Sequence, residues 1–169
     1  MELNKLYFAK IRKDAITPSK EDENAGYDIY PNFEEDYIFI PPGKTMKIPT
    51  GIACAFSKDY VFILKERSST GILGIGQRSG VIDSGYRGEI LVPITNHTDM
   101  YICIAKTHVL KELNTLSIKL PLIILDYKKA ICQGILTIVP KVETEEISYE
   151  ELLKFKSKRG VGREGSTNK

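Results

Sequence analysis

Short runs of β-branched and aromatic residues alternate with turn residues along most of this chain. The runs are separated by segments such as Pro41-Pro42-Gly43 and Pro49-Thr50-Gly51, which favour turns. The predicted strands cover residues 6–11, 37–40, 45–48, 60–64, 90–94, 101–105, 116–125 and 131–139. Many short strands with turns between them predict an all-β fold, such as a sandwich, a barrel or a jelly roll.

Signals for helices are few. Ser148 followed by Glu151 has the sequence of a capping box, which predicts a helix over residues 149–155. Residues 68–73 can form a short helical turn. Because there is no repeat and no long linker, we expect one β domain over residues 1–158 and a C-terminal arm over residues 159–169.

The arm follows a segment in which the charge changes sign. Residues 141–151 are acidic, whereas residues 154–163 are basic. A solvated, disordered tail accounts for this composition. The alternative is an arm that wraps a polyphosphate, because glycines let backbone N–H groups approach anionic oxygens and Arg159 adds a fork-shaped charge.

Composition restricts the partners and the compartment. The 169 residues suffice for one domain that buries roughly two-thirds of its unfolded surface. A net charge of +2 and a pI of about 8.3 do not favour binding to duplex nucleic acid or to a membrane surface. The three cysteines, Cys54, Cys103 and Cys132, have no metal-binding spacing and are expected to be buried thiols in a reducing compartment.

The N-terminal residues lack the pattern of a signal peptide, and the longest apolar run, residues 120–125, is too short to span a bilayer. We therefore expect a soluble intracellular protein, cytoplasmic or, in a eukaryote, also nuclear. His97 and His108 have no acidic or cysteine partner at the spacing of metal ligands, so they do not predict a metal site.

Residues 80–90, Gly-Val-Ile-Asp-Ser-Gly-Tyr-Arg-Gly-Glu-Ile, are the most informative segment of the chain. They predict a hairpin, with a strand over residues 80–82, a tight turn at Ser84-Gly85 and a returning strand over residues 88–92. Asp83 then lies at the end of the first strand of the hairpin, close to Tyr86. Such a rigidly held carboxylate can act as a base at the mouth of a pocket, although an ordinary surface hairpin explains the same residues.

Four further segments accompany residues 80–90 in a fixed order, namely Ala25-Gly26-Tyr27-Asp28-Ile29-Tyr30, Arg67-Ser68-Ser69, Ala130-Ile131-Cys132-Gln133, and residues 159–167. Together the five segments resemble the ordered motifs of the trimeric dUTPase family (deoxyuridine triphosphate nucleotidohydrolases). The resemblance implies a distorted jelly-roll (β-clip) subunit. It also implies a homotrimer with a swapped or reaching C-terminal arm, in which each active site collects motifs from three subunits. The implied reaction converts dUTP and water to dUMP and pyrophosphate, with Mg²⁺ chelated by the triphosphate.

The resemblance assigns roles around the hairpin. Asp83 is the base that activates the attacking water. Main-chain groups of Gly80, Val81 and Ile82 pair with the edge of uracil in a slot that excludes the methyl group of thymine. Tyr86 packs on the deoxyribose and leaves no room for a 2′-hydroxyl group.

The resemblance also assigns the phosphate contacts. Arg67 neutralises charge on the leaving phosphates, and Ser68 binds the oxygen that bridges to them. Asp28 contacts the magnesium ion through water. Taken alone, Ser68 could be a helix N-cap and Asp28 a turn carboxylate. The other implied substrate contacts are Ser69, Gln77, Gln133, Arg159, Gly165 and Ser166.

Several features depart from the family pattern. Glu66 stands where the family often has proline, Ala130 replaces the arginine of the fourth motif, and Glu164 replaces the phenylalanine that stacks on uracil. The segment between the third and fourth motifs is longer than usual, which predicts an insertion near residues 105–124. Its apolar content indicates that it packs on the domain, and we expect an added hairpin.

Two alternatives remain. A dCTP deaminase has the same fold but requires an arginine where this chain has Ile72 and a glutamate where it has Pro93. A non-catalytic or regulatory nucleotide-binding relative is favoured by Glu164 and by the insertion. Release of pyrophosphate from dUTP, with release of ammonia from dCTP as the control, discriminates between these alternatives.

Overall fold

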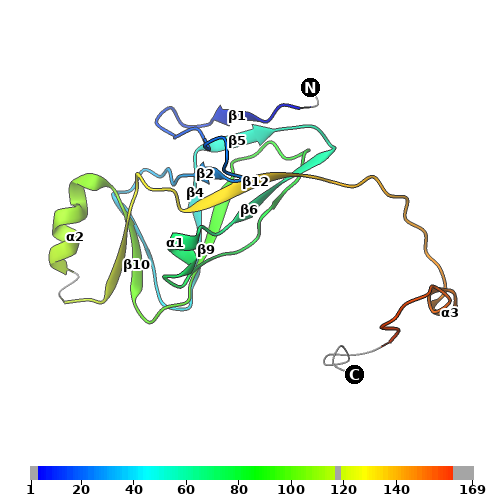
Figure 1. Cartoon of the computed structure of the whole chain (residues 1–169). Coiled ribbons are helices and arrows are strands. Elements are labelled where there is room, and N and C mark those ends of the chain that lie inside the picture. The colour runs from blue at the N-terminus through cyan, green and yellow to red at the C-terminus, as the bar shows by residue number, and fades with distance from the viewer. Residues whose placement is uncertain (1–3, 117–118, 162–169) are drawn as a thin grey trace. The chain divides into compact units, whose positions relative to one another are not determined.

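The computed structural model describes residues 4–116 and 119–161 (Figure 1). By its internal contacts the chain forms two compact units, Met1–Val139 and Pro140–Lys169. We call them the core unit and the C-terminal unit and describe each by itself.

The core unit consists mainly of short strands. Their bounds are β1 Tyr7–Lys10, β2 Tyr27–Ile29, β3 Tyr37–Ile40, β4 Thr45–Pro49, β5 Ile52–Ala55, β6 Tyr60–Lys65, β7 Ile75–Gln77, β8 Val81–Ile82, β9 Leu91–Asn96, β10 Tyr101–Ala105, β11 Leu122–Asp126 and β12 Cys132–Ile138. They form four sheets with the orders β2-β12-β6-β8, β4-β9-β7, β11-β10-β3 and β1-β5. This arrangement confirms the predicted all-β, jelly-roll-like fold.

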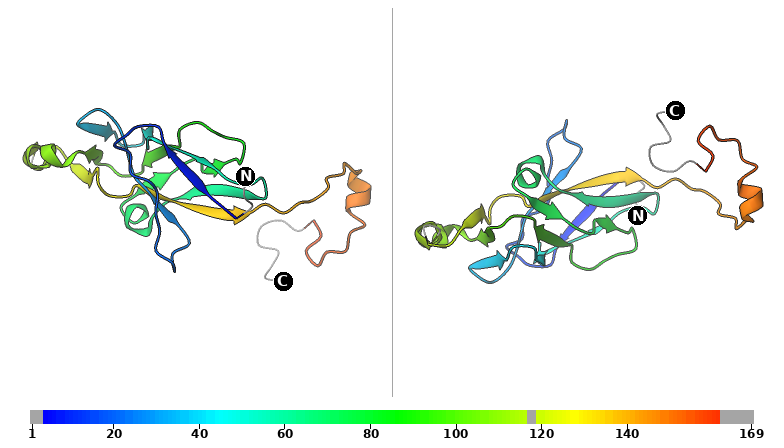
Figure 2. Two further views of the ribbon diagram at one scale, coloured as in Figure 1. Left: turned by 90° about the horizontal axis from the view of Figure 1, so that it is seen from above. Right: turned by 90° about the horizontal axis from the view of Figure 1, so that it is seen from below.

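Strand β6 lies at the centre of the core and alternates in burial. On β6, Phe62 and Leu64 are fully buried while Val61 and Ile63 are only half-buried. β12 lies along the whole of β6, from the pair Gln133–Lys65 to the pair Ile138–Tyr60, and it can be followed as the yellow strand in both views of Figure 2. Burial along the middle of β6 therefore follows the period of two at which successive side chains of a strand point to opposite faces.

The prediction of a hairpin over residues 80–92 is wrong, because the two strands do not pair with each other. β8 pairs with β6, through Phe62–Ile82 and Ile63–Val81, whereas β9 pairs with β4 and β7. The two strands that flank the Asp83 loop therefore belong to different sheets, and the loop crosses between them. The tight turn at Ser84-Gly85 is present and is closed by a hydrogen bond from Tyr86 N to Asp83 O of 3.0 Å.

The insertion is also different from the predicted hairpin. It forms a 3₁₀ turn, η1 Thr107–Val109, and a helix, α2 Leu110–Leu116, before β11 returns parallel to β10. Parallel neighbours need a crossover connection, which α2 provides. The predicted packing is correct, because Leu113 and Leu122 are buried together with Cys103 and Ala105. Residues 117–118 of the predicted strand over residues 116–125 lie outside the described part of the chain.

The C-terminal unit contains one described helix, α3 Tyr149–Leu152. Its capping box is confirmed, since Ser148 Oγ accepts from Glu151 N at 3.2 Å and Glu151 Oε2 accepts from Ser148 N at 3.0 Å. The hydrogen bonds that Ser148 N and Ser148 Oγ donate to this carboxylate, the second at 2.9 Å, lower the pKa of Glu151. The helix is shorter than the predicted range of residues 149–155. In the described parts of both units, no helix is long and apolar enough to cross a membrane.

Candidate active site

Strands that carry four of the five motifs lie in one sheet, in the order β2-β12-β6-β8. Asp28 on β2 lies opposite Gln133 on β12, and Gln133 also pairs with Lys65 at the end of β6. Arg67 follows β6, and Asp83 follows β8. The sheet thus brings Asp28, Arg67 and Gln133 together at one end of β6.

The side chain of Arg67 links three segments. Its Nε atom lies 3.1 Å from Asp28 Oδ1, and its Nη1 atom donates a hydrogen bond of 3.2 Å to the carbonyl of Ala130. Arg67 has an extended backbone and is the N-cap of helix α1, Ser68–Gly71. Ser68 is therefore the first residue of α1, and the alternative that it serves as the N-cap is wrong.

Gln133 holds the residue that precedes Arg67. Its Nε2 atom donates a hydrogen bond of 3.0 Å to Glu66 O. A Cβ atom on Gly26 would lie 2.5 Å from Gln133 Oε1, so glycine at this position lets the amide lie close to the segment before β2. The half-buried amide thus connects the first, second and fourth motifs.

Titratable groups beside Arg67 have shifted pKa values. Burial raises the pKa of the Cys132 thiol far above its usual range, with a further rise from Asp28 and an opposing effect of Arg67. This thiol is therefore neutral and unsuited to act as a nucleophile. The pKa of Glu66 is lowered by a hydrogen bond to its own backbone and, to a smaller extent, by Lys65.

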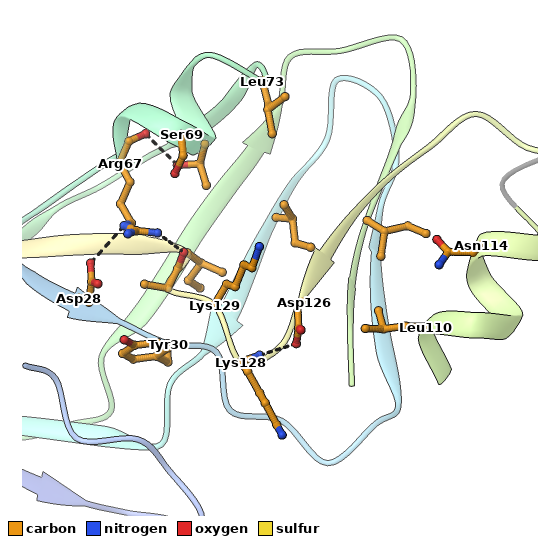
Figure 3. Close-up of a pocket in the computed structure, with 15 residues that line it drawn as sticks. Asp28, Tyr30, Arg67, Ser69, Leu73, Leu110, Asn114, Asp126, Lys128 and Lys129 are labelled. Carbon is orange, nitrogen blue, oxygen red and sulfur yellow. Dashed lines mark hydrogen bonds and ion pairs between the residues drawn. The ribbon is translucent and has the colours of Figure 1, made fainter. Parts of the chain in front are cut away.

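A cavity of about 780 Å³, which we call the larger cavity, opens beside this cluster (Figure 3). Its lining residues are Asp28, Tyr30, Arg67, Ser69, Thr70, Leu73, Leu110, Asn114, Ile124, Leu125, Asp126, Lys128, Lys129, Ala130 and Ile131. Motif residues form a polar wall, and α2 and β11 of the insertion contribute a largely apolar one. No pattern in the sequence places the insertion next to the second motif, because the parallel pairing of β11 with β10 brings it there.

A second cavity of about 190 Å³, which we call the smaller pocket, lies at the Asp83 loop. It is lined by Val81, Ile82, Asp83, Tyr86, Glu89 and Leu91. Tyr86 Oη donates a hydrogen bond of 3.0 Å to Glu89 O, which fixes the ring. A Cβ atom on Gly88 would lie 2.4 Å from Tyr86 Oη, so the close approach of the ring requires glycine there.

Glu89 anchors the Asp83 loop to the segment between β4 and β5. Its Oε1 atom accepts hydrogen bonds from Thr50 N at 3.1 Å and Gly51 N at 2.7 Å and also pairs with Arg12. Arg12 in turn donates to the Asn32 carbonyl at 2.7 Å. The loop that carries Asp83 is therefore held by charged and backbone contacts rather than by strand pairing, and no signal in the sequence marked Arg12 as a partner.

Gly80 and Gln77 hold the segment that leads into β8, the strand before the Asp83 loop. Gly80 O accepts from Leu64 N at 2.7 Å, and a Cβ atom on Gly80 would lie 2.5 Å from Leu64 O. Gln77 Nε2 donates to Arg78 O at 2.6 Å and to Ser79 O, where Ser79 has a positive φ of 50°. Gln77 lines neither cavity, and its side chain donates instead to the backbone of residues 78 and 79, before β8.

Asp83 and Arg67 lie at opposite ends of β6. Since Ile82 pairs with Phe62 in an antiparallel register, Asp83 is placed beside Val61. The extended stretch from Val61 to Arg67 spans about 20 Å at the usual rise per residue. The larger cavity and the smaller pocket share no lining residue. Within one chain, Asp83 and Arg67 therefore cannot contact the same phosphate.

Some predicted site residues are not joined to either cavity. Ser68 is exposed and lines neither of them. Arg159 belongs to the C-terminal unit, while Glu164, Gly165 and Ser166 lie outside the described residues. In the described part of the chain, no group of three or more His, Cys, Asp or Glu side chains could hold a metal ion.

Comparisons with known proteins agree with these motifs. The dUTPase family model matches residues 12–110. The deoxyuridine 5′-triphosphate nucleotidohydrolase of Nautilia profundicola is 30% identical over 169 residues, an alignment that covers 98% of this chain and 99% of that protein.

Solved structures of dUTPases share the fold. The dUTPase of Staphylococcus bacteriophage 80alpha with dUPNHPP has a TM-score of 0.73 at 19% identity and covers 96% of this chain and 98% of that one. A variant of the dUTPase from phage phi11 of S. aureus, described with a structural Mg(II) ion, has a TM-score of 0.64 at 20% identity. Its alignment covers 87% of this chain and 99% of that one. At these identities the structures show the fold alone.

Proposed function

Because this chain belongs to the dUTPase family, we propose that it hydrolyses dUTP to dUMP and pyrophosphate, with Asp83 as the base. The single observation that carries this proposal is the smaller pocket, where Asp83 and Tyr86 line one small cavity on a braced loop. Hydrolysis at the α-phosphorus needs an oriented water, a base and cations around the displaced phosphates. The chain offers a group for each requirement.

Asp83 is suited to take a proton from water. Its carboxylate is exposed at the end of β8, where a water molecule can reach it. The turn after it is closed by Tyr86 N and braced by Arg87, whose Nη1 atom donates to Ser84 O at 2.6 Å. A base held in this way keeps its position during the reaction, and general-base catalysis contributes about 10²–10⁴-fold to a rate.

The nucleoside would occupy the smaller pocket. The backbone of Gly80, Val81 and Ile82 would pair with the uracil edge, and Tyr86 would pack on the deoxyribose. Support comes from the small volume of the pocket and from the fixed ring of Tyr86. A rigid wall at the sugar discriminates by excluding the additional 2′-hydroxyl group.

The phosphates would lie in the larger cavity of another subunit, near Arg67, Ser68, Ser69 and Gln133. Arg67 presents a guanidinium group there, and Ser69 lines the same space. Asp28 suits a magnesium ion bound through water. Its Oδ1 atom pairs with Arg67, while Oδ2 has no hydrogen bond or ion pair to a described residue, and a carboxylate oxygen is a ligand that Mg²⁺ accepts. When bound, Mg²⁺ would neutralise charge on the triphosphate.

We further propose a homotrimer whose sites combine Asp83 of one subunit with Arg67 of a neighbour. The distance of about 20 Å along β6 between the two residues supports a shared site. The arm, with Arg159, Gly165 and Ser166, would contribute phosphate contacts from a third subunit. Light scattering should then give about 57 kDa, three times the 19.0 kDa of one chain. A monomer that hydrolyses dUTP efficiently would contradict this arrangement.

The decisive experiment measures pyrophosphate release from dUTP by the full chain and by Asp83→Asn. The variant keeps the shape of the side chain but cannot accept the proton, so its rate should fall by about 10²–10⁴-fold with little change in affinity for a non-hydrolysable analogue. Retention of most of the turnover would exclude Asp83 as the base. Release of ammonia from dCTP, or nucleotide binding without any hydrolysis, would reject the proposed reaction.

A further inference from the structure

Lys128 and Lys129 occupy the turn between β11 and β12, at the edge of the larger cavity. The turn is fixed by Asp126, whose Oδ1 atom accepts from Lys128 N and whose carbonyl accepts from Lys129 N, each at 2.9 Å. Figure 3 shows that the two side chains point in different directions. Lys129 extends into the space between α1 and β11, while Lys128 points away from α1.

Lys129 adds a positive charge on the side of the cavity that faces α1. Arg67 is partly neutralised by Asp28 at 3.1 Å and also donates to Ala130 O at 3.2 Å. The ammonium group of Lys129 forms no ion pair or hydrogen bond with any residue that the structure describes. It is therefore a cation whose three donors are available to a ligand, beside the polar wall that contains Ser69.

We propose that Lys129 binds the β- and γ-phosphates of the nucleotide, in place of the arginine that the family pattern would put at position 130. This assignment rests on the proposed function for the identity of the nucleotide. Ala130 is buried and has no charge, so the cation lost there must come from another position if the site is to keep it. Lys129 in the adjacent turn supplies such a cation, on a side chain that is exposed and long enough to adjust to its ligand.

A lysine at this position should distinguish ligands by their phosphates. It should strengthen binding of triphosphate and of inorganic tripolyphosphate but not of dUMP, which lacks the β- and γ-groups. Since the side chain is exposed, solvent screens part of the interaction. We expect removal of the charge to weaken tripolyphosphate binding by about five- to tenfold, below the full effect of a desolvated charged hydrogen bond.

The test compares Lys129→Met with Lys128→Met, a matched control that removes the same charge from the neighbouring residue, and with Lys129→Arg. Calorimetry gives the dissociation constants of inorganic tripolyphosphate with Mg²⁺ and of dUMP for the 169-residue protein. Lys129→Met should lose about five- to tenfold in affinity for tripolyphosphate and none for dUMP, while Lys128→Met should change by less than about twofold. Lys129→Arg should restore most of the affinity, which a purely structural role of the stem would not predict.

Equal losses in Lys128→Met and Lys129→Met would overturn the assignment, because they would reflect only the general charge of the turn. Unchanged binding in Lys129→Met, or no binding of tripolyphosphate to the unmodified protein, would overturn it as well. Failure of the unmodified protein to release pyrophosphate from dUTP would instead reject the proposed function. The tripolyphosphate measurement remains valid in that case, since it requires no hydrolysis.

Discussion

Two inactive variants should restore activity when they are assembled into the same oligomer. The variants are Asp83→Asn, which removes the proposed base, and Arg67→Gln, which removes the cation beside Asp28. These residues lie about 20 Å apart along β6, so one chain cannot supply both to one substrate. In a symmetric assembly, however, each site can draw them from different chains.

The recovery can be worked out from this geometry. Each variant alone should lose about 10²-fold or more in turnover, the usual effect of removing a base or a group that stabilises developing charge. If equal amounts associate at random and each site uses Asp83 of one chain and Arg67 of the next, both residues are intact in about a quarter of the sites. If one chain supplied both, no site would be intact.

The assay is pyrophosphate release from dUTP after the two variants are unfolded and refolded together. Each variant refolded alone measures the residual activity, and the unmodified protein treated in the same way gives the reference. We expect the mixture to reach about a quarter of that reference, whatever the separate losses are. A mixture no more active than its components, with exchange of chains verified by different tags, would refute the shared site.

Three further outcomes are expected. Tyr86→Ala should raise turnover of UTP relative to dUTP, because it removes the ring fixed over the proposed sugar position; an unchanged preference in steady-state assays would place sugar selection elsewhere. Gly134→Ala should reduce the free energy of unfolding in urea by about 1–3 kcal/mol, because its Cβ atom would lie 2.1 Å from a ring atom of the buried Phe62, whereas Gly85→Ala, with open space around it, should have little effect. Burial raises the pKa of Cys103 to about 11, so stability should be retained below the ordinary pKa of a thiol and lost as the pH rises toward 11. In urea titrations above pH 9, the free energy of unfolding should therefore fall less steeply with pH in Cys103→Ala than in the unmodified protein. The difference should be up to about 1.4 kcal/mol per pH unit.

The sequence predicted several strands well because they are uninterrupted runs of β-branched and aromatic residues. β3 and β10 match their predicted ranges, and β6 differs by one residue. The strands β2, β5 and β7 were missed. β2 and β7 are three residues long, and β5 contains Ala53 and Ala55, which have little β propensity. Their strand conformation comes from pairing with distant partners, such as β5 with β1, which a local pattern does not contain.

The insertion contained a helical signal that the prediction of a hairpin ignored. Leu110, Leu113 and Leu116 are spaced at intervals of a helical face, and the structure places them on α2. The location of the insertion and its apolar packing were nevertheless predicted from its length and composition. Its contribution to the larger cavity could not be predicted, because that depends on the parallel pairing of β11 with β10.

The motif order along the chain supplied the candidate site residues, but it did not predict how they are arranged. Proximity of Asp28, Arg67 and Gln133 follows from the sheet order β2-β12-β6, and separation of Asp83 from them follows from the register of β8 on β6. A local rearrangement cannot bring the two ends of β6 together, because β12 pairs with it along its length and Phe62 and Leu64 are fully buried. Moving Asp83 to Arg67 within one chain would require breaking this sheet. A second chain can supply the missing partner without any such cost, so the association proposed above would leave the fold intact.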